Sequence, residues 1–131
     1  CCSECVLQAI AESRGIASVL IPAVATGLCA GIAYTSGPCG ALTGAILGVG
    51  LAVGRRDPAG DKRRAYGVVQ DLIAQFEARF GATDCAALTG VDLATPEGHA
   101  AYHAAGQRAR CADYVAEATR LALALLEDGA G

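Results

Sequence analysis

The sequence predicts an all-α protein, a single-domain helical bundle around a central helix rich in glycine and alanine. Apolar residues recur at steps of three and four in several segments, which is typical of amphipathic helices. No segment alternates apolar and polar residues with the period of two expected for a half-buried strand. Caps, prolines and glycines stand where helices should begin and end. The length of 131 residues, without an internal repeat, predicts one domain over residues 1–131.

The composition excludes two broad classes of protein. Hydrophobic residues make up 53% of the chain and charged residues 18%, so there is enough apolar surface to offset chain entropy, and a disordered chain is excluded. The net charge is −3, and aromatic residues are only 5%, with no tryptophan. Neither phosphate neutralisation nor base stacking is favoured by these values, so we expect no nucleic-acid partner.

The N-terminal segment predicts two short helices. Residues 2–13 carry apolar residues between charged ones, as in an amphipathic helix, and Gly15 ends it. Residues 19–26 predict a second helix with Pro22 in or near its first turn. Residues 27–32 are too rich in glycine to be assigned.

The central helix is expected from Pro38 to about Val53. Ser36 or Gly37 can cap it, and Pro38 suits its first position. Three glycines spaced by four residues make one smooth stripe along this helix; they are Gly40, Gly44 and Gly48. Each costs up to about 1 kcal/mol relative to alanine, and dense packing or a buried group would offset that cost.

A hairpin of two membrane spans is the alternative interpretation of this region, because the 40 residues between Arg14 and Arg55 carry no charge. A span needs about 20 apolar residues. Pro22 and residues 34–38 divide the stretch, and its second part, residues 39–53, has only 15 residues. We therefore favour a helix buried in a soluble protein, with no membrane partner.

The C-terminal half predicts three more helices. Residues 55–64 hold five of the ten basic residues and are interpreted as a solvated loop rather than an anion site. The following helix has an apolar stripe and ends at Gly81; the stripe is Tyr66, Val69, Ile73, Phe76 and Phe80. Thr83 and Asp84 can cap a short helix over residues 85–88.

The last helix opens at Thr95-Pro96-Glu97, and Gly106 can bend or break it. Its apolar seam steps by three and four residues; the seam is Cys111, Tyr114, Ala118, Leu121 and Leu125.

Seven cysteines, an odd number, argue against a fully paired disulfide framework and favour metal or redox use of thiols in a reducing, cytoplasmic compartment. Cys39 and Cys85 lie in the first turn of predicted helices, where the helix dipole and free N–H groups stabilise a thiolate. Cys111 lies on the apolar seam and is expected to face inward, while Cys2 opens the first helix. The spacing between these four matches no zinc knuckle or ferredoxin run.

Other motifs are weaker. Cys2-Ser3-Glu4-Cys5 is a CxxC without the preceding strand of a thioredoxin, and Val6 stands where a covalent haem motif needs histidine. His99 and His103 have the i, i+4 spacing that permits metal binding, but no third ligand is placed beside them, so an exposed pair is the simpler interpretation. No residue can be assigned a catalytic role.

Residues 39–44, Cys-Gly-Ala-Leu-Thr-Gly, match a CGAxxG motif, and the chain resembles the C_GCAxxG_C_C family of small proteins described as redox-active. The resemblance extends over nearly the whole chain and implies that the family cysteines correspond to Cys2, Cys39, Cys85 and Cys111. The family is also similar to the cluster-bearing part of split-Soret cytochromes, which implies an iron–sulfur cluster. Cys29 stands where the family loop usually has another glycine, and Cys5 is extra.

Three hypotheses for the function follow. The leading one is an iron–sulfur protein for electron transfer or redox sensing, with Cys2, Cys39, Cys85 and Cys111 as ligands and Cys5 or Cys29 as substitutes. The second is a metal-free thiol–disulfide protein in which two of the four cysteines cycle. The third is a protein whose fold is stabilised by a structural zinc ion.

The sequence does not identify a redox partner protein. A homo-oligomer is expected because a small bundle leaves flat apolar faces uncovered.

Overall fold

The structure is a computed structural model that describes residues 1–104 and 107–128. Within these ranges the chain forms seven α-helices and one 3₁₀ helix, and no strand, which confirms the predicted all-α class. In chain order the elements are α1 (Cys2–Ser13), η1 (Ala23–Leu28), α2 (Cys29–Tyr34), α3 (Gly40–Val53), α4 (Arg63–Phe80), α5 (Cys85–Thr89), α6 (Pro96–Ala104) and α7 (Gln107–Asp128).

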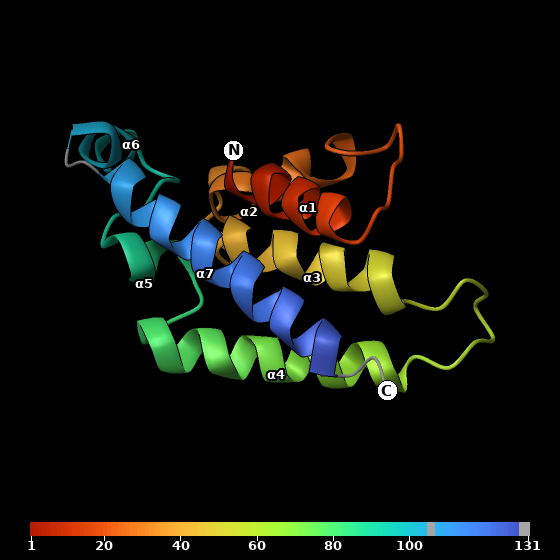
Figure 1. Cartoon of the computed structure of the whole chain (residues 1–131). Helices are drawn as coiled ribbons and strands as arrows, with labels where there is room; N and C mark the ends of the chain where they lie inside the picture. Colours follow the sequence, from red (N-terminus) through yellow and green to blue (C-terminus); the bar gives the residue numbers. More distant parts are fainter. Residues whose placement is uncertain (105–106, 129–131) are drawn as a thin grey trace.

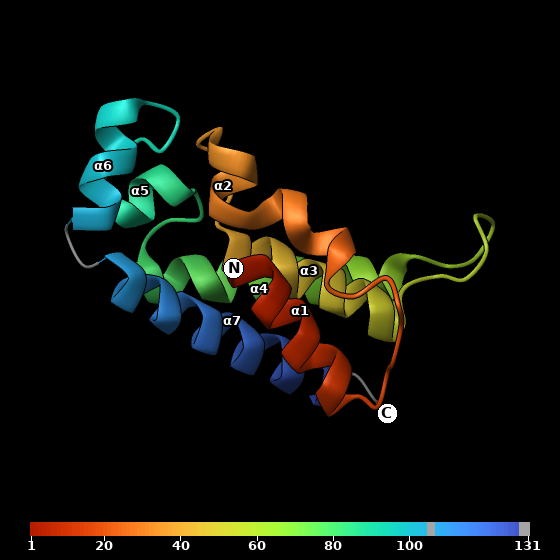
Figure 2. The same cartoon turned by 90° about the horizontal axis from the view of Figure 1, so that it is seen from above.

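Helix α3 lies at the centre, with α1, α4 and α7 packed around it (Figures 1 and 2). The central position was predicted, but the helix begins at Gly40 rather than at Pro38. Cys39 is the N-cap, with an extended ψ of 131°, and its N–H donates to the carbonyl of Thr83 at 2.8 Å. This bond to a distant loop holds residues 38–39 outside the helix.

The glycine stripe of α3 faces α1. A Cβ at Gly44 would lie 2.5 Å from the carbonyl oxygen of Ser3, and one at Gly48 would lie 2.6 Å from Ile10 Cδ1. Both distances are far below van der Waals contact, so α1 can pack this closely only because the side chains are absent. The close approach expected from the stripe is confirmed, and the burial of the facing side chains offsets the helix-propensity cost of the glycines.

No membrane hairpin forms between Arg14 and Arg55, because this region is divided into short elements. Helix α3 has 14 residues, against about 20 needed for a span. Throughout residues 1–104 and 107–128, every helix is too short or too polar to cross a bilayer.

The helix predicted over residues 19–26 is wrong in type and position. The structure instead has the 3₁₀ helix η1, which begins after Pro22, and Val19 and Leu20 lie in an exposed loop. The residue before a proline avoids the α region, and proline has no N–H to bond to a preceding turn. These two effects place the start of the helix after Pro22.

The unassigned glycine-rich segment contains a left-handed turn. Residues 30–34 all have positive φ, between 51° and 66°, although only Gly31 adopts such values without steric cost. The Gly37 N–H donates to the Gly31 carbonyl at 2.7 Å, and Thr35 Oγ1 donates to the Ile32 carbonyl at 2.6 Å. These bonds and the packing around the turn offset a cost of about 1–2 kcal/mol for each non-glycine residue.

We expect Ala33→Gly to stabilise the protein by about 0.5–1 kcal/mol. Ala33 has φ of 51° and is exposed, so the change relieves left-handed strain without removing a packed side chain. The gain is smaller than the strain because glycine loses more backbone entropy on folding. Chemical denaturation measures the difference. Ala78→Gly, at an exposed position inside α4, is the matched control and should lose about 1 kcal/mol; a loss in both variants would contradict the prediction.

The C-terminal helices follow the predicted periodicity with one shift. Helix α4 ends at Gly81, which is left-handed with φ of 83°, as predicted. Its most buried residues are Val68, Leu72 and Phe76, whereas Tyr66, placed on the predicted stripe, is exposed. The shift arises because α4 contacts both α3 and α7 and buries the face between them.

The predicted seam of α7 is largely confirmed. Its most buried residues are Tyr114, Ala118, Leu121, Ala122 and Leu126, while Cys111 and Leu125 pack against this core and are partly buried. The cap of α6 is also confirmed, since Thr95 Oγ1 accepts the Gly98 N–H at 2.9 Å. Gly106, expected to bend or break the last helix, lies outside the described residues.

Candidate functional site

A cavity of about 530 Å³ at one end of the bundle is lined by the four predicted cysteines. Cys2 is the first residue of α1, Cys39 caps α3, Cys85 is the first residue of α5, and Cys111 lies in α7. Apolar side chains complete much of the wall; they include Leu88, Leu93, Ala112 and Val115. Four helices that are distant in sequence thus each bring one of the predicted cysteines to a single, mainly apolar cavity.

Two loops hold Cys39 and Cys85 beside each other. The Cys39 N–H donates to the Thr83 carbonyl at 2.8 Å, and the Cys85 N–H donates to the Gly37 carbonyl at 3.0 Å. The two segments therefore form an isolated antiparallel β-bridge. Since each cysteine donates its own backbone N–H to the opposite loop, the positions of the two thiols are coupled.

Glycines provide the room for two of the thiols. A Cβ at Gly40 would overlap the sulfur of Cys2, and one at Gly31 would lie 2.7 Å from Cys85 Cβ. The first glycine of the CGAxxG motif is therefore needed to admit the Cys2 side chain next to α3. Gly31 belongs to the left-handed turn, so that turn also forms part of the site.

Burial controls the protonation of the thiols. It raises the pKa of Cys39 to about 12 and that of Cys85 to about 11, and these side chains are 6% and 8% exposed. The N–H groups of Leu42 and Ala41 favour the Cys39 thiolate, as expected at a helix start, but they lower its pKa by less than desolvation raises it. The prediction that these two cysteines are stabilised as thiolates is therefore wrong for the metal-free protein.

The same burial predicts a loss of stability at high pH. The folded state of the reduced, metal-free protein favours the neutral thiols, whose pKa values lie above the ordinary 9.0. This contribution to the free energy of unfolding is complete below pH 9 and should disappear as the pH rises towards about 12. Urea denaturation at pH 8 and pH 11 measures it. The Cys39→Ala/Cys85→Ala double variant should show a smaller decrease over this range, and an equal decrease would contradict the assignment.

Two residues that the sequence interpretation did not select contact the cysteines. The Tyr102 hydroxyl of α6 lies 3.3 Å from the sulfur of Cys111, and Thr89 Oγ1 donates to the Cys85 carbonyl at 2.7 Å. The position of Thr89, four residues after Cys85 in one helix, is a local signal for such a bond. No comparable signal marks Tyr102, because its contact depends on how α6 lies against α7.

A model of the family described as "Putative redox-active protein (C_GCAxxG_C_C)" matches residues 1–125. The chain belongs to the C_GCAxxG_C_C family. No curated protein and no solved structure matches it. Family membership, together with the thiols gathered at one cavity, supports a redox role for this chain.

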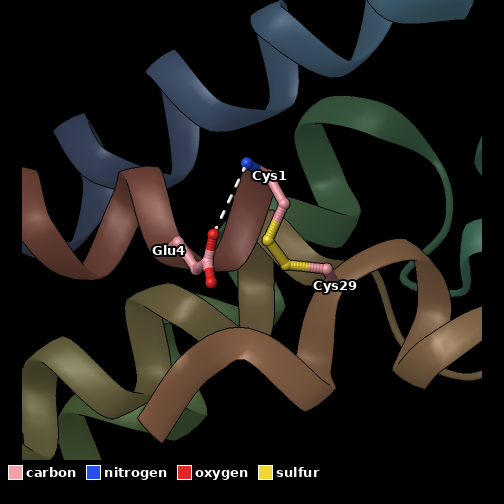
Figure 3. A group of neighbouring side chains, drawn as sticks. All are labelled: Cys1, Glu4 and Cys29. Atoms are coloured by element: carbon pink, nitrogen blue, oxygen red, sulfur yellow. Dashed lines mark ion pairs between the residues drawn. A yellow bond between two sulfur atoms is a disulfide. The ribbon is translucent and has the colours of Figure 1, made fainter. Parts of the chain in front are cut away.

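A disulfide joins Cys1 to Cys29 at the edge of the cavity, with Glu4 beside it (Figure 3). Cys29, one of the two substitute ligands that the sequence offers, is thus bonded to Cys1. The pairing with Cys1 was not foreseen from the sequence. Cys5, the other substitute, is exposed and has a free thiol. The structure thus separates the three cysteines outside the predicted ligand set into a bonded pair and an exposed thiol.

The two histidines form an exposed pair on α6. The Nε2 atoms of His99 and His103 are 2.9 Å apart. In the part of the chain that the structure describes, no third metal-binding side chain lies within reach of them. His103 also lines the cavity, but neither histidine belongs to the predicted ligand set.

Proposed function

We propose that Cys2, Cys39, Cys85 and Cys111 bind an iron–sulfur cluster and that the protein serves in electron transfer or redox sensing. The observation that carries this proposal is the convergence of four unpaired cysteines from four helices on one mainly apolar cavity. Cysteine thiolates are the usual protein ligands of such clusters. A bound cluster would supply one-electron chemistry at its iron atoms.

The spacing of the four sulfurs favours a cluster over a single zinc ion. Zinc with four thiolates at about 2.3 Å in a tetrahedron requires sulfurs about 3.8 Å apart. Among these four cysteines, all within the described residues, no three sulfur atoms lie within 4.8 Å of one another. A cluster places several metal atoms between its thiolates and therefore suits sulfur atoms that lie farther apart.

Neighbouring groups of this chain would tune the bound cluster. The N–H groups of Ala41 and Leu42 favour the thiolate form of Cys39, and the Tyr102 hydroxyl lies within reach of the Cys111 sulfur. Hydrogen bonds to ligand sulfur and limited access of water set the potential of such centres. The apolar wall that includes Leu88 and Leu93 would exclude part of the solvent.

A metal-free thiol–disulfide function is the second candidate, and the Cys1–Cys29 disulfide favours it. The free thiols of Cys2 and Cys5 line the same cavity as this disulfide. A thiolate that attacks one sulfur of a disulfide forms a mixed disulfide and displaces the other sulfur as a thiolate. Such an exchange would need no cofactor.

The test is visible absorption, with iron, sulfide and zinc analysis, of the anaerobically purified wild-type protein. We expect a brown protein that contains iron and acid-labile sulfide. Colourless protein with zinc in place of iron would support the structural zinc hypothesis. Protein without metal, in which Cys39 is disulfide-linked to another cysteine, would overturn the cluster and favour thiol–disulfide exchange.

A further inference from the structure

We infer that Cys1, Glu4 and Cys29 form a second metal site, which binds a thiophilic divalent cation such as Zn²⁺ only after the Cys1–Cys29 disulfide is reduced. The two sulfurs and a carboxylate oxygen of Glu4 all lie within 4.8 Å of one another. Figure 3 shows the disulfide between α1 and the start of α2 with the Glu4 carboxylate beside it, paired with the N-terminal nitrogen of Cys1. This inference does not depend on the proposed cluster, because it uses none of its four cysteines.

Neighbouring hydroxyl groups hold the ligands in place. Thr26 Oγ1 donates to Glu4 Oε2 at 2.6 Å, and Glu4 Oε1 lies 3.8 Å from the N-terminal ammonium of Cys1, an ion pair that a bound cation would replace. The fully buried Ser3 hydroxyl donates to the Ala25 carbonyl at 2.7 Å and lies 2.9 Å from the Cys29 sulfur. Partners of this kind orient metal ligands and raise affinity.

The disulfide can open into a metal-binding dithiol without movement of the backbone. The Cα atoms of Cys1 and Cys29 are 5.9 Å apart, so rotation of the side chains can bring the sulfurs to the separation of about 3.8 Å that tetrahedral zinc requires. Glu4 provides a third ligand, and water can complete the tetrahedron. The two thiolates and the carboxylate carry three negative charges, which suits a divalent cation.

A dithiol or a phosphine can supply the two electrons that reduce the Cys1–Cys29 disulfide. Two electrons and two protons convert the disulfide into two thiols, while a dithiol becomes a disulfide or a phosphine becomes its oxide, with oxygen from water. Binding of Zn²⁺ then releases the two thiol protons. Oxidation removes both thiolate ligands, so formation of the Cys1–Cys29 disulfide prevents metal binding at this site.

The test is titration of the Cys39→Ala protein with zinc sulfate, by calorimetry, after reduction with a phosphine and after oxidation with diamide. Cys39→Ala removes one of the four proposed cluster ligands and keeps the second site intact. We expect one Zn²⁺ per reduced chain and none per oxidised chain at micromolar metal. Wild-type protein, purified without metal, is titrated in parallel, so a folding defect of Cys39→Ala does not decide the result.

Matched variants identify the ligands. Cys29→Ala should remove this one bound Zn²⁺ from both the wild-type and the Cys39→Ala protein. Glu4→Gln should weaken the zinc affinity of the site at least tenfold. Glu12→Gln, an exposed carboxylate on the same helix, should leave it unchanged. Cobalt in place of zinc should give thiolate charge-transfer absorption that disappears with Cys29→Ala. A number of bound Zn²⁺ ions that is unchanged by oxidation or by Cys29→Ala, or reduced and folded wild-type protein that binds no zinc, would overturn the inference.

Discussion

Cys39→Ala should remove all iron and sulfide from the anaerobically purified protein. Cys39 is among the most buried of the cavity thiols, at 6% exposure, and it is fixed by its backbone bond to Thr83. Alanine offers no ligand, and no other thiol can take this position because none of the remaining cysteines lies in α3 or in the loop before it. The iron would therefore be left open to solvent, and the cluster would be lost.

Cys5→Ala is the matched control for this experiment. Cys5 also lines the cavity, but its side chain is exposed and it lies outside the proposed ligand set. Its replacement should leave the iron and sulfide content within error of wild type. Far-ultraviolet circular dichroism of both variants shows whether the helices persist. Full cluster content in folded Cys39→Ala would exclude Cys39 as a ligand and the proposed ligand set with it.

Gly44→Ala should destabilise the protein by about 3 kcal/mol or more. The added methyl group would lie 2.5 Å from the Ser3 carbonyl oxygen and 2.8 Å from Ser3 Cα. These are backbone atoms, so the clash can be relieved only by moving α1 away from α3, and overpacking of this kind typically costs about 1–3 kcal/mol even where side chains can yield. Because α1 also carries Cys2, the metal content should fall together with the stability.

Gly50→Ala provides the opposite result on the same helix. No atom lies within 4 Å of a Cβ built at Gly50. Alanine should therefore stabilise α3 by up to about 1 kcal/mol through helix propensity alone. Urea denaturation of the two variants under reducing conditions measures the contrast. Equal stability of Gly44→Ala and Gly50→Ala would show that α1 does not pack on the glycine stripe.

The helical skeleton could be predicted from the sequence because its signals are local. Apolar periodicity located α1 and α4, and the glycine after α4 marked its end. The stripe of small residues in residues 40–48 predicted that another backbone approaches α3. Caps, proline positions and periodicity depend on neighbours within about one or two turns, so a single sequence contains them.

The segment that packs against each helix face is often distant in sequence. These distant contacts account for the points at which the structure differs from the prediction. Val68 and Leu72 are buried in place of Tyr66 because α4 packs between α3 and α7. The left-handed turn at residues 30–34 violates local preference and persists only through its bonds and packing. Neither result can be obtained from the periodicity of the segment itself.

The candidate site, like the fold, could be predicted only in part from the sequence. The resemblance of residues 39–44 to the family motif implied which cysteines belong together, but their separations of 37, 46 and 26 residues contain no geometric information. Their convergence depends on loop-to-loop hydrogen bonds such as that from Cys85 to Gly37, and on packing between helices. The protonation of Cys39 was likewise decided by tertiary structure, because burial raises its pKa by more than the helix start lowers it.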